Sequence, residues 1–277
     1  MTTRRRLDAE LVRRRLATSR AHAVELVGAG RVLVGGAPAD RASRLVAAGE
    51  PLEVLGPPPR FVSRAGAKLD AAIARFGVDV AGRRCLDAGA STGGFTDCLL
   101  QRGAAVVHAV DVGRGQLHER LRSDRRVVVH ERTNIRTATL PGLFQEEGFD
   151  VVVADLSFIS LRAVAGRLVE LARPGGDLVV LVKPQFEVGR QVVSRGRGVV
   201  RDEQAWGQAL LGAITALQGA GAAMMGLMVS PVRGADGNVE FLAHLSRAGA
   251  PPPGGTADVE RAVAAAVAAV GSAPAGV

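Results

Sequence analysis

Between residues 84 and 246 the sequence alternates short apolar runs with longer segments of helical pattern, and this alternation restricts the possible folds more than any other feature. Short apolar runs bounded by glycine or polar residues are typical of buried strands. Strands that alternate with helices form a mostly parallel sheet covered by helices on both faces. We therefore expect an α/β domain with a Rossmann-like sheet. Its strands should lie near residues 84–88, 105–110, 126–130, 150–155, 177–182, 223–229 and 240–246.

The first 60 residues are more basic than the rest of the chain. They hold eleven Arg against six Asp or Glu, whereas the whole chain of 277 residues has a formal net charge of +8. Their pattern predicts two short helices and then short strands, which is a small α+β module. An excess of basic side chains favours an anionic partner, with nucleic acid and an anionic membrane surface as the first candidates.

Composition shifts suggest four segments. Residues 1–56 form the basic module, and residues 57–63 form a linker that begins with three prolines, which make it stiff and extended. The alternating pattern then fills residues 64–248. Residues 249–277 begin with Pro251-Pro252-Pro253 and continue as an Ala- and Val-rich run. We expect this last segment to be a disordered tail with at most one marginal helix.

One stretch, Gln204 to Val232, is almost entirely uncharged and is long enough to suggest a membrane span. Glutamine and glycine residues interrupt it, so a buried helix near 204–218 and a buried strand near 223–229 explain it better. Residues 2–15 are charged and lack the apolar core of a signal peptide. The two cysteines, Cys85 and Cys98, fit buried thiols in a reducing compartment. We expect a cytoplasmic monomer that does not enter a membrane.

A glycine-rich turn follows the first strand of the predicted sheet. It reads Asp87, Ala88, Gly89, Ala90, Ser91, Thr92, Gly93, Gly94, Phe95, Thr96. Glycines here let the backbone turn tightly and approach a ligand, and ligands of such sheets bind beyond the carboxyl ends of the strands. The turn alone would also fit NAD or no ligand. It lacks the GxGxxG spacing for a pyrophosphate, and Asp87 could accept a hydrogen bond from an ammonium group.

Two further positions extend this candidate ligand site. Asp111 ends the second strand, where a carboxylate is placed to bind ribose hydroxyls. Asn134 follows the third strand and would either contact an adenine edge or cap a helix, a role that Asn also favours. Together with the turn, these residues resemble the S-adenosylmethionine pocket of class I methyltransferases. The cofactor-binding residues expected on this basis are Asp87, Gly89, Ala90, Ser91, Thr92, Gly93, Gly94, Phe95, Asp111 and Asn134.

The chain contains 35 Lys and Arg residues, and only Lys68 and Lys183 are lysines. An arginine stays protonated in any protein site, whereas a desolvated lysine near a second cation can be tuned to release a proton. A ribose hydroxyl is a weak nucleophile until its proton is withdrawn. The two lysines are therefore candidates for activating a hydroxyl, although chance surface lysines would also explain them.

The positions of these lysines suggest acidic partners. Lys183 follows the strand that ends near residue 182, and Asp155 follows the strand near 150–155. Lys68 lies on a helix that opens the second domain, and Glu240 begins the last strand. Taken singly, Asp155 or Glu240 could be a helix cap or a surface acid.

The order Lys68, Asp155, Lys183, Glu240 is similar to the catalytic tetrad of the FtsJ-type ribose 2′-O-methyltransferases. The segments SRAGAKL (63–69), DAGASTGGFTDCLLQRGA (87–104), DLSFISL (155–161), LVKPQFEVGR (181–190) and GADGNVEFL (234–242) resemble the TlyA family in particular. The resemblance spans about residues 5–247. It implies a class I methyltransferase fold, S-adenosylmethionine as cofactor, and methylation of ribosomal RNA from one or both ribosomal subunits.

The resemblance also assigns roles to the tetrad. Lys183 would activate or orient the 2′-hydroxyl, Asp155 and Lys68 would fix and tune it, and Glu240 would balance the charge. The hydroxyl oxygen would then attack the sulfonium methyl group in line. No metal is required, and the sequence has no His/Cys cluster with ligand spacing.

The N-terminal segment resembles the RNA-binding domain named after ribosomal protein S-four, although a basic helical cap with solvated arginines would share its composition. RNA contacts are expected from Arg4, Arg6, Arg13, Arg14, Arg20, Arg64, Arg190, Arg195 and Arg197. The last three lie in a Gly- and Arg-rich segment, residues 185–201, which we interpret as a mobile lid over the RNA or as a plain solvated loop.

Two features depart from the expected pattern. Relatives commonly carry a Trp in the linker where this chain has Phe61, so any role of that Trp is in doubt here. The chain has no Tyr, and aromatic residues make up 3% of it. Base stacking would therefore depend on few rings, such as Phe158 and Phe186, or on arginine planes.

The remaining alternatives are a small-molecule methyltransferase, a pore-forming hemolysin, and a non-catalytic ribosome-binding factor.

Overall fold

The computed structural model describes residues 4–17, 20–57, 59–137, 148–189, 196, 198–234, 236–247 and 256–271. The chain divides into two compact units, Met1–Arg60 and Phe61–Val277. Each unit has its own hydrophobic core and is described separately below.

The N-terminal unit is a small α+β module, as the sequence predicts. Its elements are β1 (Arg4–Arg6), α1 (Leu7–Arg13), α2 (Arg20–Gly28), β2 (Val32–Val34), β3 (Ala37–Pro38), β4 (Leu45–Ala47) and β5 (Leu52–Val54). Strand β2 pairs antiparallel with both β3 and β5, and β1 pairs antiparallel with β4. The fully buried Leu7 and Leu11 of α1 pack with Ala23 of α2 and Val32 of β2. Thr18 and Ser19, which precede α2 in the sequence, lie outside the described residues.

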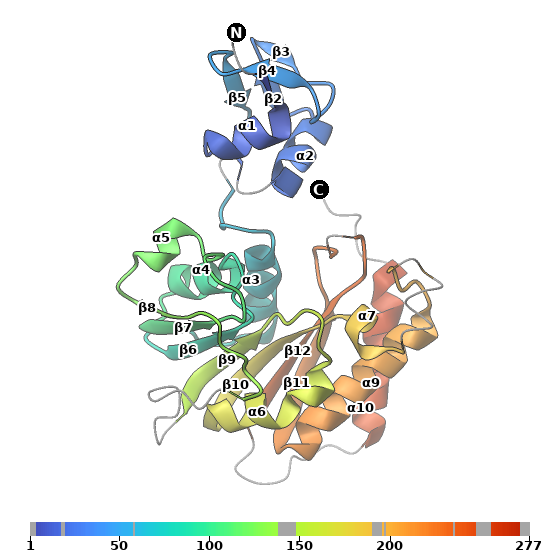
Figure 1. Cartoon of the computed structure of the whole chain (residues 1–277). Helices are drawn as coiled ribbons and strands as arrows, with labels where there is room; N and C mark the ends of the chain where they lie inside the picture. The colour runs from blue at the N-terminus through green and yellow to red at the C-terminus, as the bar shows by residue number, and fades with distance from the viewer. Residues whose placement is uncertain are drawn as a thin grey trace. The chain divides into compact units, whose positions relative to one another are not determined.

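The second unit is a seven-stranded sheet with helices on both faces (Figure 1). Its elements are α3 (Ala65–Phe76), β6 (Arg84–Ala88), α4 (Gly94–Gln101), β7 (Val106–Val110), α5 (Glu119–Arg122), β8 (Val127–His130), β9 (Phe149–Ala154), η1 (Leu161–Ala163), α6 (Ala165–Leu171), β10 (Ala172–Val182), α7 (Pro184–Glu187), α9 (Glu203–Gly219), β11 (Ala222–Val229), β12 (Phe241–Arg247), α10 (Thr256–Ala268) and η2 (Ala269–Gly271). All seven predicted strands are present.

The strands follow the order β11-β12-β10-β9-β6-β7-β8. The five strands from β10 to β8 are parallel, and β12 runs antiparallel to both of its neighbours. The chain thus starts in the middle of the sheet at β6, builds outward to β8, and then returns to build the other half. This reversal of strand order between β6 and β9 is where open α/β sheets bind ligands.

Strand β10 begins five residues earlier than the sequence predicts. Its first part, Ala172 to Gly176, contains Arg-Pro-Gly-Gly, which reads as a turn. In the structure, Ala172 pairs with Phe149, and the register shifts before Asp177 pairs with Val151. A Cβ on Gly176 would come within 2.9 Å of the carbonyl oxygens of Arg173 and Phe149. The irregularity lets a glycine-containing segment stay in the sheet.

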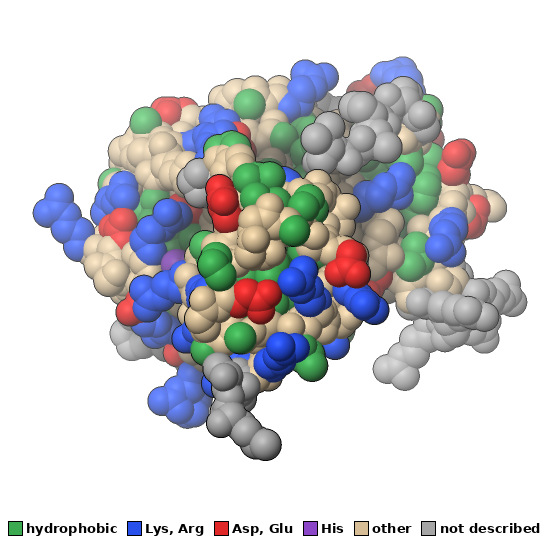
Figure 2. All heavy atoms as spheres, turned by 90° about the horizontal axis from the view of Figure 1, so that it is seen from above, with side chains coloured by type: hydrophobic (Ala, Val, Ile, Leu, Met, Phe, Trp, Pro, Cys, Tyr) green, Lys and Arg blue, Asp and Glu red, His purple; other side chains and the backbone are tan. Residues whose placement is uncertain are grey.

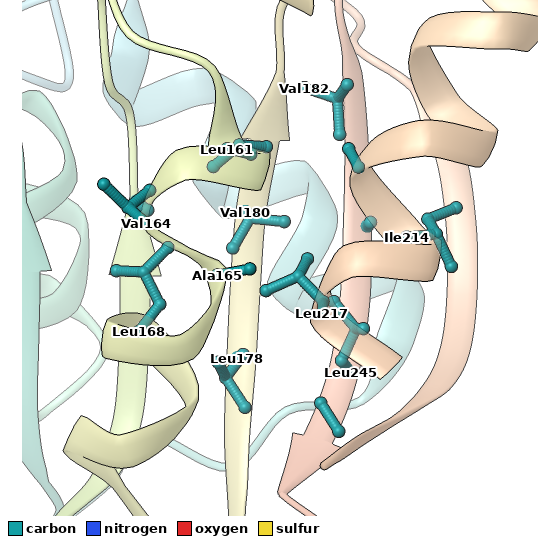
Figure 3. Packing of buried hydrophobic residues seen from close by; sticks show 14 of the residues in the cluster. Leu161, Val164, Ala165, Leu168, Leu178, Val180, Val182, Ile214, Leu217 and Leu245 are labelled. Atoms are coloured by element: carbon teal, nitrogen blue, oxygen red, sulfur yellow. The ribbon is translucent and has the colours of Figure 1, made fainter. Parts of the chain in front are cut away.

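One face of the sheet is covered by α6, α9 and α10, and the other by α3 and α4 (Figure 1). Each face has its own hydrophobic core: the first core lies under α6, α9 and α10, and the second under α3 and α4. In the first core, leucine and valine side chains of β10 pack against those of α6 and α9. Figure 3 shows Val180 of β10 in this cluster, together with Ala165 of α6 and Leu217 of α9. In the second core, Cys85 and Cys98 are buried free thiols, as predicted. Burial raises the pKa of the Cys85 thiol to about 12.

The uncharged stretch divides into a helix and a strand. Helix α9 begins after Asp202, whose carboxylate accepts hydrogen bonds from the backbone N–H groups of Gln204 and Ala205. Its buried face packs in the first core, and the chain then enters strand β11. In the part of the chain that the structure describes, no helix is both long enough and apolar enough to cross a membrane.

The C-terminal segment differs from the expected tail. Residues 256–268 form helix α10, and Val259, Val263 and Ala266 of this helix are buried in the first core. The spacing of these three residues at intervals of four and three places them on one helix face. The composition of alanine and valine suggested disorder, but a partner surface from α9 and β11 was available to cover that face.

The end of the expected linker also differs. Phe61 and Val62 are buried in the second core, and the backbone N–H of Val62 donates to the buried carboxylate of Asp97 at 2.8 Å. The second unit therefore begins at Phe61 rather than at residue 64. The Phe61 ring packs against Gly66, where a Cβ would come within 2.4 Å of it.

Candidate active site

Three of the four tetrad residues lie at one edge of the sheet because of strand pairing. Val182 of β10 is the pairing partner of Phe241 of β12, so Lys183 and Glu240, the next residues outward, are opposite one another. Asp155 follows β9, which pairs with both β10 and β6. The structure thus brings together side chains that are separated by up to 85 positions in the sequence.

Lys183 forms an ion pair with Asp155. Its Nζ lies 2.6 Å from Asp155 Oδ1 and donates a hydrogen bond to Ser157 Oγ at 2.9 Å. The ammonium group also lies 5.9 Å from the centre of the Phe186 ring. Because Lys183 precedes Pro184, the first residue of α7, its backbone stays extended and its side chain begins at the end of the strand.

Lys68 forms the second ion pair, with Glu240. Lys68 lies on the buried side of α3, and both side chains of this pair are buried. Its Nζ donates to Glu240 Oε2. A buried charge requires a partner, and removing one member leaves the other uncompensated. The four residues therefore form two lysine–carboxylate pairs, and the strand pairing of Lys183 with Glu240 makes these pairs neighbours.

The glycine-rich turn lies next to Asp155. The backbone N–H of Asp155 donates to the carbonyl of Ala88 at 3.0 Å, and Gly89 adopts a φ of 86°. A Cβ on Gly89 would lie 2.6 Å from the carbonyl oxygen of Asp155. Gly93 also has a positive φ, and a Cβ there would collide with Leu121 and Leu117. Both glycines are required by conformation and by space.

Asp87 is completely buried beneath this turn. Its Oδ2 accepts a hydrogen bond from Thr96 Oγ1 at 2.7 Å, but its Oδ1 has no partner within the protein. Burial raises the pKa of Asp87 to about 7, and the nearby carboxylates of Asp155 and Asp111 add to this effect. An unpartnered buried carboxylate oxygen is costly, so it indicates a site for a donor or cation that comes from a ligand.

Asp111 lies on the other side of the turn. Its two carboxylate oxygens accept hydrogen bonds from the backbone N–H groups of Ser91 at 2.8 Å and Gly113 at 2.6 Å. A cleft at this place is lined by Ala90, Ser91, Ala109, Asp111, Gly113, Gln116, Leu117, Val129 and Glu131. Asn134 is not among the lining residues. Its Oδ1 caps a turn by accepting from the N–H of Arg136 at 3.0 Å, which is a capping role of the kind that the sequence left open.

The predicted RNA-contacting arginines of the N-terminal unit differ in their surroundings. Arg6 and Arg20 both donate to Asp8 Oδ2, at 2.9 Å and 3.0 Å, and both are exposed. Arg13 is exposed and pairs with the buried Glu10. On the face of the molecule seen in Figure 2, basic side chains lie among acidic ones.

Arg14 has a structural role that the sequence analysis did not anticipate. Its side chain is only 21% exposed, and it donates to the backbone carbonyls of Glu50 and Ala48, both at 2.7 Å, as well as to Glu10. Its guanidinium therefore holds the β4–β5 turn against α1. These contacts give the Arg14 guanidinium a structural role in the module, and its predicted contact with RNA stays a prediction.

The other predicted RNA contacts are less defined. Arg4 lies on the exposed strand β1, and Arg64 is the exposed residue that precedes α3. Arg190, Arg195 and Arg197, with the other residues of 190–195, lie outside the described residues. Phe158 and Phe186 do come together, with ring centres 5.4 Å apart. Phe158 is 92% exposed, which is unusual for a large apolar side chain.

Two residues near the site were not singled out from the sequence. Ser157 contacts Lys183, and Glu187 accepts hydrogen bonds from the segment that follows Asp155. The available signal was proximity in sequence, since Ser157 lies two residues after Asp155 and Glu187 four residues after Lys183.

Among the described residues, no group of three or more His, Cys, Asp or Glu side chains is arranged to hold a metal ion.

Two family models match the chain. The model of the FtsJ-like methyltransferases matches residues 61–247, and the model of the S4 domain matches residues 5–52. A relative from Mycobacterium tuberculosis, named 16S/23S rRNA (cytidine-2′-O)-methyltransferase TlyA, is 50% identical over 88% of this chain and 91% of its own length. Hemolysin A of Brachyspira hyodysenteriae is 39% identical over 86% of this chain and 98% of its own length.

Solved structures agree with these matches. One from Streptococcus thermophilus, which carries a provisional hemolysin name, is 37% identical with a TM-score of 0.76, and the match covers 98% of both chains. A methyltransferase from Listeria monocytogenes is 14% identical with a TM-score of 0.50 over 66% of this chain and 98% of that chain, which shows a shared fold. The likeness to the first structure extends over both units.

Proposed function

Because the chain belongs to the TlyA family of FtsJ-like methyltransferases that carry an S4 domain, we propose that it transfers a methyl group from S-adenosylmethionine to a ribose 2′-hydroxyl of ribosomal RNA. The observation that carries this proposal is the contact of Lys183 with Asp155 directly beside the glycine-rich turn. An ammonium group held at that position would orient a hydroxyl group toward a methyl donor bound at the turn.

The residues of the turn fit the proposed cofactor. The unpartnered Oδ1 of Asp87 would accept a hydrogen bond from the cofactor's ammonium group, and Gly89 and Gly93 allow the backbone of the turn to pack tightly against Asp155 and Leu121. Asp111, at the edge of the cleft, would bind ribose hydroxyls. When bound there, S-adenosylmethionine supplies an electrophilic methyl group on a sulfonium sulfur. Asn134 contributes to adenine binding only if its side chain leaves the turn that it caps.

The chain's own residues would position the 2′-hydroxyl group and accept its proton. Lys183 is held by Asp155 and Ser157, so its ammonium group has a fixed direction. After releasing one of its own protons to solvent, Lys183 would accept the hydroxyl proton as the 2′-oxygen attacks the methyl group, and the ammonium group so formed would stay paired with Asp155. Lys68 and Glu240 form a buried pair beside it and set the local charge. Because the nucleophile is held in line, positioning provides much of the rate enhancement.

The remaining features fit an RNA substrate. The S4 domain offers exposed arginines at Arg4, Arg6, Arg13 and Arg20 for phosphates. The exposed ring of Phe158, next to Phe186, offers a surface on which a base can stack. Ribosomal RNA as substrate would place the protein in the cytoplasm. The name hemolysin among the relatives raises a pore-forming alternative, which the experiment below distinguishes.

Radioactive methyl transfer from S-adenosylmethionine to purified ribosomal subunits tests the proposal. We expect the Lys183→Ala and Lys68→Ala variants to lose at least about 100-fold in transfer rate, the usual scale for a positioned acid–base group. Lys183→Arg should also be impaired, because a guanidinium keeps the charge but not the geometry of an ammonium group. Arg261→Ala, which removes a cation that is 78% exposed on α10, should retain full activity.

The outcomes separate the alternatives. Wild-type activity in both lysine variants would disprove the mechanism. Binding to ribosomal subunits without any methyl transfer by the wild type would favour a non-catalytic ribosome-binding factor. Leakage of dye from liposomes that does not depend on Lys183 would favour the pore-forming alternative. Mapping of 2′-O-methyl sites on ribosomal RNA would then identify the nucleotide and the subunit.

A further inference from the structure

Two separate links join the segment after β9 to the segment after β10. The first is the contact of Lys183 with Asp155 and Ser157. The second lies one helical turn further on, where Glu187, the last residue of α7, contacts Ser160 and Leu161. The two links flank residues 157–160, which we call the arch.

The second link is built from a buried carboxylate. The Glu187 side chain is 2% exposed, and both of its oxygens are used. Oε2 accepts from Ser160 Oγ at 2.5 Å, and Oε1 accepts from the backbone N–H of Leu161 at 2.6 Å. Arg162 completes the group, because its Nε lies 3.6 Å from Oε2 and its Nη2 donates to the Glu187 carbonyl at 2.9 Å.

The arch itself requires support. Phe158 adopts a φ of 65°, which is a strained backbone conformation for a residue with a side chain, and its ring is almost fully exposed. At one end, the N–H of Asp155 is fixed to the carbonyl of Ala88. At the other end, Ser160 begins the short helix η1 by accepting from the N–H of Arg162. Glu187 is the group that ties this end to the strand that carries Lys183.

We propose that Glu187 is a positioning residue for methyl transfer. Its carboxylate fixes the far end of the arch against α7, and it thereby sets the place of Asp155 and Ser157 relative to Lys183 and holds the Phe158 ring outward. This role rests on the proposed function, because it concerns the placement of the groups that would orient the ribose. The Glu187 carboxylate bonds to Ser160 and to the N–H of Leu161, and it acts on Asp155, Ser157 and Lys183 through these residues.

The test compares Glu187→Gln with Glu170→Gln in the full-length protein. The amide of Glu187→Gln keeps the size of the side chain, but it turns one acceptor into a donor that faces Ser160 or the Leu161 N–H. Glu170 lies on α6, is 58% exposed, and pairs only with the side chain of Arg167, so it provides a matched change outside the site. The measurements are the single-turnover rate on ribosomal subunits, the affinity and stoichiometry of S-adenosylmethionine by calorimetry, and the midpoint of thermal unfolding.

We expect the single-turnover rate of Glu187→Gln to fall about 10- to 100-fold, the scale for a misplacement near 1 Å. Its affinity for S-adenosylmethionine should stay within about twofold of wild type, because Asp87, Asp111 and the turn are untouched. Glu170→Gln should match the wild type in all measurements. Ser160→Ala should lose part of the rate, and the double variant should lose less than the product of the two single effects, since both changes break the same link.

Three results would overturn or replace the inference. A wild-type rate in Glu187→Gln would show that the link has no influence on transfer. A parallel fall of rate, cofactor stoichiometry and thermal midpoint would show that Glu187 only supports the fold. A wild-type protein that transfers no methyl group to ribosomal subunits would overturn the proposed function itself, whereas an active wild type with an equally active Glu187→Gln overturns the inference alone.

Discussion

At the scale of single residues, Asp87 shows how the proposed cofactor site differs from a stable core. Its carboxylate is completely buried, and only one of its two oxygens has a partner in the protein. Burial raises the pKa of this group to about 7, so near neutral pH part of the population holds a proton there. A well-packed core would place an apolar or fully bonded side chain at this position, because an unpaired buried polar group is unfavourable. We infer that the position is kept for cofactor binding.

We expect the substitution Asp87→Asn to increase the stability of the protein and to weaken cofactor binding. The pKa of Asp87 is raised in the folded state, so its carboxyl group keeps a proton at pH values at which the unfolded chain has released it. The stabilisation that this proton provides is complete below about pH 4 and is lost as the pH rises through about 7. A shift from 3.8 to about 7 corresponds to at most about 4 kcal/mol. An asparagine has no such proton to lose.

The stability of Asp87→Asn relative to wild type, measured by urea unfolding without cofactor, should therefore increase from pH 5 to pH 8. At the same time the variant should bind S-adenosylmethionine at least about tenfold more weakly, because a charge-assisted hydrogen bond is lost. Wild-type affinity should itself rise with pH through about 7. Unchanged cofactor affinity in the variant would rule out Asp87 as the ammonium ligand.

At the scale of elements, helix α1 shows that neighbouring arginines can have different tasks. Arg13 and Arg14 both contact the buried carboxylate of Glu10, which lowers the pKa of Glu10 to about 2. Arg13 extends into solvent, whereas Arg14 donates to backbone carbonyls of the β4–β5 turn. From the sequence alone the two are equivalent members of a basic run. Only the position of the turn beside α1 distinguishes them.

We expect Arg14→Ala to destabilise the N-terminal unit by about 1–3 kcal/mol, because the carbonyls of Ala48 and Glu50 and the buried carboxylate of Glu10 lose a hydrogen-bond partner. Arg13→Ala should cost less than about 1 kcal/mol, as is usual for an exposed ion pair. Conversely, Arg13→Ala should weaken RNA binding in a folded protein. Hydrogen exchange of the β2 and β5 amides, measured beside RNA affinity, checks both statements. Equal effects of the two substitutions on stability would contradict the assignment.

At the scale of the whole molecule, the excess of basic side chains indicates the kind of partner that the protein binds and does not indicate its fold. A formal net charge of +8 favours association with polyanions, and the comparisons place an S4 domain in the basic N-terminal unit. Contacts with phosphates release counterions, so the affinity for RNA should fall linearly with salt concentration on logarithmic axes. The slope reports how many phosphates the protein neutralises.

The double variant Arg6→Ala/Arg20→Ala should reduce that slope by about 1, in addition to weakening binding. Both side chains are exposed and are held together by Asp8, which makes them a suitable pair for one phosphate group. The matched control is Arg41→Ala/Arg261→Ala, which removes two exposed arginines from outside the predicted contacts. Filter binding to a ribosomal RNA fragment at several salt concentrations gives the slopes. An unchanged slope in the first variant would exclude these two arginines from RNA binding.

Much of the second unit could be predicted because local patterns carry the information. The apolar runs near 84–88 and 150–155 become β6 and β9, and Gly89 and Gly93 of the turn adopt positive φ values, which glycine adopts most easily. The rarity of lysine identified Lys68 and Lys183, and the family resemblance supplied their acidic partners. Patterns of this kind depend on residues that are close in sequence, so they can be recognised without the fold.

Features that depend on distant segments could not be predicted in this way. Helix α10 is stable because α9 and β11 cover its valines, and Phe61 joins the second core because Gly66 leaves room for its ring. Likewise, Glu187 and Arg14 have their roles because tertiary packing brings particular N–H, hydroxyl and carbonyl groups beside them. The sequence by itself determined the strands, the glycine-rich turn and the residue types of the predicted tetrad. Only the tertiary structure decided which side chains are desolvated and which donors they meet, since both depend on contacts between segments far apart in the chain.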